Sequence, residues 1–346
     1  MLYATTRSNV DIYTAQRVMK EDRAGDGGLF VPMTLPPFLP HELRQFAQQP
    51  PSDTMAAVLS RFFPGTLSGK TLEFSAGKEF CANRVLSYKI EVSEWWKNSQ
   101  GSLERLAQKL CKAASEDYLE FQPGDWAQIA VRIGLLAAVW GEMSRNKLVS
   151  AANAMDVSVA GADDRMVLAA WYARKMGLPI HKIIVCCNEN NFLWDLLNRG
   201  QIRCSGPVTP TCTPRYDHSC RDTVERLIYG AFGRVESNRF AQSCQKNTTF
   251  FINGEQQRVL EDAIYVSVLG NRRVQRAVSE VYGSFRQVLC PYSALCYCGI
   301  LDYRAETGAR NPALLPVLHS PMEQAQAVTE AMGISEAELK RRLNLK

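Results

Sequence analysis

Residues 164–187 read DRMVLAAWYARKMGLPIHKIIVCC, and this stretch decides the fold class. Its first part predicts a helix over residues 164–176, which ends where Gly177 and Pro179 interrupt the pattern. Its second part, residues 182–187, is a continuous apolar run rich in β-branched residues, as expected of a strand that is buried on both faces. A helix that leads directly into such a strand is typical of the βαβ units of a parallel sheet.

The flanking sequence continues this alternation of strands and helices. We expect a short strand over residues 156–160 and a helix over residues 190–198 that stops at Gly200. Apolar residues at helical spacing between positions 224 and 232 predict a further helix. Ser335, with Glu338 three residues later, predicts a capping box before the last helix. The sequence therefore predicts an α/β protein with three αβα layers and a parallel-rich sheet.

Composition and charge narrow the classes of function. The chain of 346 residues has a formal net charge of +5, and its only dense basic stretch is a helix end near the C-terminus, so we expect no nucleic-acid partner. The longest apolar stretch, 129–140, contains Arg132 and is too short to cross a bilayer, so we expect no membrane partner. The first residues show no secretory signal, and five of the eleven cysteines lie in apolar runs: Cys186, Cys187, Cys290, Cys296 and Cys298. The sequence predicts a cytoplasmic protein.

One group of soft ligands could hold a metal ion: Cys204, Cys212, His218 and Cys220. No pair among them has the spacing of two to four residues that structural zinc sites favour. We interpret the segment as an irregular surface loop with unpaired thiols and no metal, and zinc is the alternative.

Three segments resemble the threonine synthase family. The opening Tyr3-Ala4-Thr5-Thr6-Arg7, followed by DGGLFVP at residues 26–32, is similar to the start of that family. The longest likeness is YARKMGLPI at residues 172–180, with KIIV at 182–185 and NEN at 188–190. A weaker likeness covers CPYSA at 290–294 and LHSP at 318–321. The order of these segments matches the family over nearly the whole chain.

The resemblance implies a fold type II pyridoxal-phosphate enzyme. Members of that family form a lysine aldimine, eliminate phosphate from phosphohomoserine and add water to give threonine. The chain departs from the pattern between Glu91 and Glu120, where about 30 residues replace a small α/β domain that closes over the cofactor. We therefore expect a threonine synthase fold with this small domain deleted. The predicted organisation is an N-terminal domain over residues 1–95 and an α/β sheet domain, the remnant of the large cofactor domain, over residues 96–346.

The cofactor lysine has no clear counterpart. The family's HGPTLAFKD motif is absent, and the nearest string is TLEFSAGKEF at residues 71–80. A Schiff base needs a lysine beside the cofactor. We interpret Lys78 as a surface lysine, and a displaced Schiff-base residue is the alternative. The SGDTG loop of the family is missing as well.

The phosphate loop departs further. The family's PSGNFGD falls on residues 160–166. Ala162 and Arg165 therefore stand at the positions of the two glycines of that motif. Asp163 and Asp164 then stand where a phosphate would bind at a helix N-terminus. We expect at least one of these carboxylates to cap the helix and to accept backbone hydrogen bonds from residues 165–167. A site for a cationic or amine ligand is the alternative.

The position that would contact the pyridine ring of the cofactor also departs from the family pattern. The family's threonine in TAHP, which meets the pyridine nitrogen, falls on Leu318, and a family lysine falls on Glu323. A leucine side chain cannot hydrogen-bond a ring nitrogen.

Three hypotheses follow. The first is a non-catalytic relative of threonine synthase, without cofactor, that binds an unknown small molecule or protein or acts as a regulator. The second is an active pyridoxal-phosphate lyase, threonine synthase included. The third is unrelated chemistry in the old cleft that uses Asp163, Asp164 and either His181 or His319. We favour the first.

Overall fold

The computed structural model describes residues 1–19, 21–64, 74–82, 84–92, 125–161, 163–218, 221–316 and 319–344. Within these ranges, the side chains of residues 74–82, 88–92 and 164 are left out of the description. The sequence also predicts a linker at residues 98–101 and a helix around Leu103, and both lie outside the described residues.

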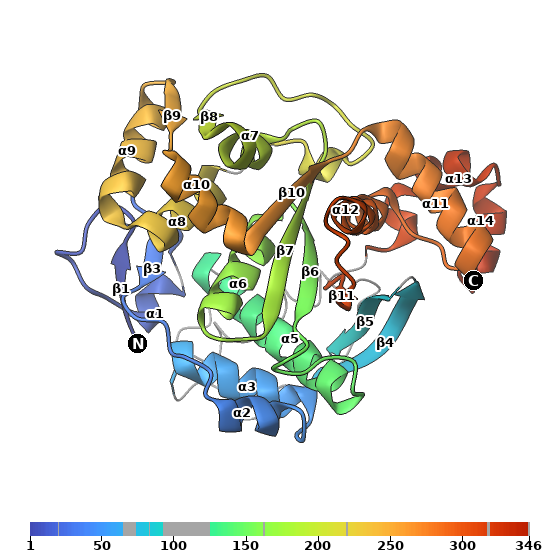
Figure 1. Cartoon of the computed structure of the whole chain (residues 1–346), viewed down its shortest axis with the longest axis horizontal. Coiled ribbons are helices and arrows are strands. Elements are labelled where there is room, and N and C mark those ends of the chain that lie inside the picture. Colours follow the sequence, from blue (N-terminus) through green and yellow to red (C-terminus); the bar gives the residue numbers. More distant parts are fainter. Residues whose placement is uncertain are drawn as a thin grey trace, which may run out of the picture.

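A six-stranded sheet forms the centre of the molecule, in the order β10-β7-β6-β11-β5-β4 (Figure 1). The first five strands are parallel, and β4 pairs with β5 in an antiparallel hairpin. The strands are β4 (Phe74–Ala82), β5 (Val85–Val92), β6 (Met155–Ala160), β7 (Ile180–Cys187), β10 (Ile264–Val268) and β11 (Ala313–Leu314). The predicted parallel-rich sheet is confirmed.

Helices cover both faces of this sheet. One face packs against α6 (Asp164–Lys175), with α7 (Phe192–Arg199) and α10 (Gly254–Ala263) beside it, and α5 (Asp125–Arg145) packs on α6. The other face packs against α12 (Pro291–Thr307), which in turn contacts α11 (Asn271–Phe285). The three αβα layers that the sequence predicts are therefore present.

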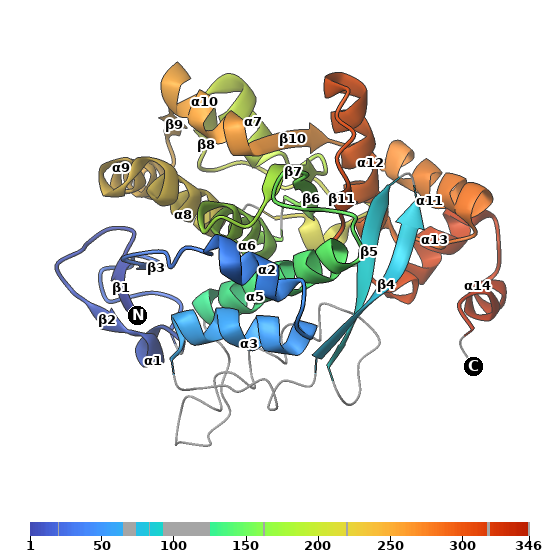
Figure 2. The same ribbon diagram turned by 60° about the horizontal axis from the view of Figure 1, so that its bottom comes forward.

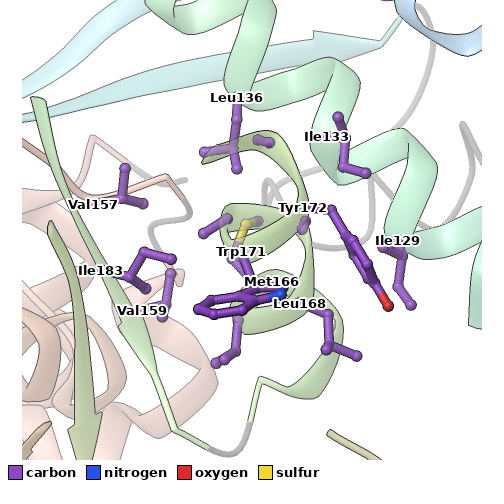
Figure 3. Packing of buried hydrophobic residues seen from close by; sticks show 14 of the residues in the cluster. Ile129, Ile133, Leu136, Val157, Val159, Met166, Leu168, Trp171, Tyr172 and Ile183 are labelled. Carbon is purple, nitrogen blue, oxygen red and sulfur yellow. The ribbon is translucent and has the colours of Figure 1, made fainter. Parts of the chain in front are cut away.

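Strand side chains explain why both faces are covered. In β7, Ile183 and Val185 belong to the core on the α6 side, while Ile184 and Cys186 belong to the core on the α12 side. Side chains alternate across a strand, so a continuous apolar run must be buried twice. Figure 3 shows α6 between α5 and the strands, with Trp171 and Met166 among the side chains packed there.

Two small sheets and the remaining helices surround this framework (Figure 2). The N-terminal segment forms a three-stranded sheet β2-β1-β3 from β1 (Leu2–Thr5), β2 (Tyr13–Thr14) and β3 (Phe30–Pro32). A two-stranded sheet pairs β8 (Gln201–Arg203) with β9 (Thr249–Phe251). The other helices are α1 (Ala15–Val18), α2 (Pro40–Phe46), α3 (Pro51–Phe62), α8 (Arg221–Phe232), α9 (Arg234–Gln245), α13 (Ala325–Met332) and α14 (Glu336–Arg342), with 3-10 turns η2 (Pro214–Tyr216) and η3 (Pro321–Gln324).

The N-terminal and C-terminal segments are interleaved in this architecture. Strands β4 and β5 precede position 95, yet β5 pairs with β11 and thereby joins the six-stranded sheet. The domain boundary at residue 95 remains a prediction, as does the deletion of a small domain. Within the described part of the chain, no helix combines the length and the hydropathy that a membrane span requires.

Candidate functional site

The candidate site lies where β6 ends and α6 begins. Gly161 follows β6, and its amide donates to the carbonyl of Cys186 at 2.8 Å, which fixes the turn against β7. A Cβ atom at Gly161 would come 2.6 Å from Sγ of Cys187, so this position has no space for a side chain. The carboxyl ends of parallel strands meet at this edge, where open α/β sheets usually bind ligands.

Asp163 caps the helix that starts at this edge. Its Oδ1 accepts a hydrogen bond from the amide of Met166 at 3.3 Å, and α6 starts at the next residue. The prediction that one of the two carboxylates serves as a cap is therefore confirmed for Asp163. The side chain of Asp164 and all of Ala162 lie outside the described residues. Arg165 turns away from the cap and pairs with Asp125 at 2.8 Å.

Aromatic side chains fill the space in front of this helix end. The remaining cavity has a volume of only about 10 Å³, and Asp163 and Met166 face Tyr216, Tyr292 and His319 across it. A cavity of this size holds about one water molecule. The ring centroids of Tyr216 and Tyr292 are 5.0 Å apart, and those of Tyr292 and His319 are 4.9 Å apart. Among the described residues that line the cavity, none is a lysine.

A chain of hydrogen bonds orients these rings. Nε2 of His319 lies 2.7 Å from the phenol oxygen of Tyr216, and Nδ1 lies 3.3 Å from Oε2 of Glu323. A carboxylate accepts only, so Nδ1–H donates to Glu323 and Nε2 accepts from the Tyr216 hydroxyl. The amide of His319 donates to Oγ of Ser293 at 3.1 Å.

The electrostatics of the chain favour a neutral Tyr216 and an ionised Glu323. Burial, and then the negative charge of Asp163, raise the pKa of Tyr216 well above its usual value. Burial alone would raise the pKa of Glu323, but the hydrogen bonds that it accepts from His319 and from the amide of Ser320, together with the charge of Arg215, outweigh burial and hold this pKa below its usual value. A buried phenol therefore donates to a hydrogen-bonded imidazole beside a cavity of about 10 Å³.

Sequence reasoning missed Tyr216 because a long-range network positions it. The side-chain Nδ2 of Asn188 donates to the hydroxyls of Thr211 and Thr213 and to Oδ1 of Asp217, at 2.8–3.0 Å. These bonds hold the segment 211–217 against the end of β7. Tyr216, the last residue of η2, then lines the cavity. The signal in the sequence was the cluster of Asn188, threonines and Asp217 next to a proline.

The other predicted site residues lie elsewhere or outside the described part. Lys78 lies on β4, opposite Tyr88 of β5, and its side chain is outside the description. Leu318, the expected pyridine-nitrogen position, lies outside the described residues, as does Cys220. Cys204 is buried in the core, and Cys244 packs against the same core. No group of three or more metal-ligating side chains occurs within the described ranges.

The hypothesis that His181 acts together with Asp163 is wrong. His181 lies at the start of β7, where Nδ1 is 2.8 Å from Oδ1 of Asp156 at the start of β6. Asp163 follows the other end of β6, about 15 Å along the strand direction at roughly 3.3 Å per residue. Residue 181 directly precedes the predicted strand at 182–187, and because β6 and β7 run parallel, it lies at the opposite end of the sheet from Asp163. His319, by contrast, does share the cavity with Asp163.

The sequence matches the family model for the threonine synthase N terminus over residues 2–77. This part of the chain is therefore similar to the threonine synthase family. Its relatives include mouse threonine synthase-like 1, 30% identical over 106 residues, or 30% of this chain and 14% of that protein. Threonine synthase of Eremothecium gossypii is 40% identical over 63 residues, or 18% of this chain and 12% of that protein. These alignments thus span much less than two thirds of either relative.

Solved structures of threonine synthases share the fold. The pyridoxal-phosphate-bound threonine synthase of Brucella melitensis superposes with a TM-score of 0.81 at 16% identity, covering 100% of this chain and 95% of that one. Threonine synthase from yeast gives a TM-score of 0.80 at 16% identity, covering 100% and 94%. At this level of identity the superpositions establish the fold of the family and leave the chemistry to the residues of this chain.

Proposed function

We propose that this member of the threonine synthase family is a non-catalytic protein with a binding or regulatory role. The observation that carries the proposal is the cavity of about 10 Å³ between Asp163, Tyr216 and His319. Sites for cofactors and other small molecules usually enclose about 300–1,000 Å³. The residues at this edge of the sheet therefore do not fit pyridoxal phosphate.

The helix end supports the same proposal. Backbone amides at a helix N-terminus are the usual anchor for a phosphate. Here the carboxylate of Asp163 already accepts from the amide of Met166. A phosphate dianion at this place would have to displace a covalently tethered anion and would lie beside its negative charge. The cap thus replaces the cofactor phosphate as the acceptor for the helix end.

The aromatic filling is held in place from behind. Tyr216 is fixed by His319. The rings of Tyr216 and Tyr292 pack in a T-shaped pair, and the Tyr292 hydroxyl accepts from Nε2 of Gln324 at 3.0 Å. A cofactor could enter only if both tyrosines moved. Nε2 of His319 would then lose the hydroxyl that donates to it. These side chains support a permanently closed site.

The direct test is incubation of the purified protein with pyridoxal phosphate, followed by visible spectroscopy and borohydride reduction. We expect no internal-aldimine band and no lysine adduct by peptide mass spectrometry, with an active threonine synthase treated in parallel as the positive control. Stoichiometric trapping at Lys78 or at any other lysine would overturn the proposal and make the chain an active pyridoxal-phosphate lyase.

A further inference from the structure

A second cavity runs along the free edge of the six-stranded sheet. It has a volume of about 1,310 Å³, and β10 forms its floor. Residues of α7, among them Trp194 and Leu197, line one wall, and residues of α12, among them Asp302 and Glu306, line the other. We call this cavity the β10 groove. It shares no lining residue with the cavity beside Asp163.

Backbone groups of β10 point into the groove. The amide of Leu269 donates to the carbonyl of Cys187 at 2.9 Å, and Val268 is the register partner of Cys187. In a parallel pair, alternate residues direct their N–H and C=O groups toward the neighbouring strand. Tyr265, Ser267 and Leu269 therefore face β7. Val266 and Val268 direct their backbone groups away from the sheet, and no described residue bonds to them there.

The walls decide what kind of partner can reach this edge. Exposed sheet edges are templates for pairing with another strand. β10 lies between α7 and α12 (Figures 1 and 2), and residues of both helices line the cavity beside its free edge. A second copy of this chain would bring the same two helices to its own edge, and the walls would meet before the two β10 strands could pair. A single extended segment has no such walls and can enter.

The two walls also differ in chemistry. On the α7 side, Trp194 packs against the core and Leu197 is buried in it, while Val268 on the floor is 37% exposed. On the α12 side, Tyr265 donates to Oε2 of Glu306 at 2.5 Å and Ser267 donates to Oδ2 of Asp302 at 2.7 Å. Side chains of an added strand alternate between the two walls. Apolar residues would face α7. On the α12 side Asp302 already pairs with Arg273, so a basic or polar residue would face Glu306.

We propose that the β10 groove binds an extended peptide segment of a partner protein, which adds a strand to the sheet edge. The segment carries apolar residues that alternate with basic or polar residues. Backbone hydrogen bonds to Val266 and Val268 supply the part of the affinity that does not depend on the peptide sequence. The side chains of the two walls select the sequence. This interaction is independent of the closed cavity beside Asp163 and would remain if that site proved to be active.

The test is selection of peptides from a displayed random heptapeptide library on the immobilised full chain. Val268→Pro removes one outward N–H and leaves the bonds to β7 intact. Thr249→Pro is the matched control, because Thr249 also lies on a strand edge, in β9, and its N–H points away from β8. We expect enriched heptapeptides with the alternating pattern, bound about five- to tenfold more weakly by the Val268→Pro variant and equally by the control.

A second variant keeps the proposal testable if Val268→Pro does not fold. Glu306 is exposed on α12, and Glu306→Lys should change the selected peptides from basic to acidic residues on that wall. The proposal is overturned if no peptide is enriched, or if the same peptides bind wild type and Val268→Pro equally. Sedimentation that finds a dimer in wild type and a monomer in Val268→Pro would make a second copy the occupant and would also overturn it.

Discussion

The phenol oxygen of Tyr216 lies 2.7 Å from Nε2 of His319, although 103 positions separate the two residues in the sequence. Both residues are at least 95% buried, and they line the small cavity beside Asp163. Under the function proposed above, the threonine synthase fold is kept while the space for a cofactor is used as core. Packing of this kind stabilises the protein, so the closed site should be visible in unfolding experiments.

Removal of the Tyr216 hydroxyl should destabilise the protein. In Tyr216→Phe, Nε2 of His319 loses its donor and stays buried, which typically costs about 1–3 kcal/mol of unfolding free energy. Tyr282→Phe is the control, because the ring of Tyr282 stacks with Arg286 and no hydrogen bond of its hydroxyl is found among the described residues. Urea unfolding of both variants measures the difference. Equal stability of the two would mean that the Tyr216–His319 bond contributes nothing.

The cap of α6 should contribute measurably to stability. Asp163→Ala removes the acceptor for the Met166 amide and should lower the unfolding free energy by about 0.5–2 kcal/mol. Asp163→Asn retains a side-chain oxygen and should recover most of the loss. Chemical unfolding of the two variants, and of the double variant with Asp164→Ala, gives the comparison. If Asp163→Ala were as stable as wild type, a ligand role for the carboxylate would become the better explanation.

A buried ion pair ties the start of α5 to α8. Asp125 contacts Arg165 at 2.8 Å and Arg226 at 3.3 Å, and the Arg226 side chain is only 2% exposed. Burial alone would raise the pKa of Asp125, but the charges of Arg226 and Arg165 outweigh it and hold this pKa below its usual value. We expect Asp125→Asn to lose about 3 kcal/mol, because it leaves a buried guanidinium without its carboxylate.

The same pair predicts a pH dependence. The folded pKa of Asp125 lies below the unfolded value of about 3.9, so its contribution is fully present above that value and is lost as the pH falls through the folded pKa. The gap in stability between wild type and Asp125→Asn should therefore narrow only below about pH 4. Asp262→Asn is the control: Asp262 also pairs with an arginine, but its side chain is 73% exposed, so little should change. A gap that stayed constant down to acid pH would contradict the pairing.

Local signals account for the parts of the structure that sequence reasoning anticipated. The buried run at 182–187, the stop at Gly200 and the Ser335 cap are each set by neighbouring residues, and β7, α7 and α14 follow them closely. Asp163 could be predicted as a cap for the same reason. Tyr216 could not, because its position depends on bonds from Asn188 to residues 23–29 positions away. The pairing of β5 with β11 is longer in range still, and no periodicity in either segment indicates it.

The contact between α12 and β7 yields the last prediction. A Cβ atom at Gly299 would lie 2.2 Å from Sγ of Cys186, a fully buried side chain with no room to move aside. Gly299→Ala should therefore force α12 away from the sheet and destabilise the protein by about 1–3 kcal/mol, despite the higher helix propensity of alanine. Gly283→Ala in α11 is the matched control, since its added methyl group meets nothing within 4 Å. There the propensity gain should act alone and stabilise the protein by up to about 1 kcal/mol. Thermal unfolding of the two variants should thus move in opposite directions, and a shift of the same sign in both would show that Gly299 is not a close-packing position.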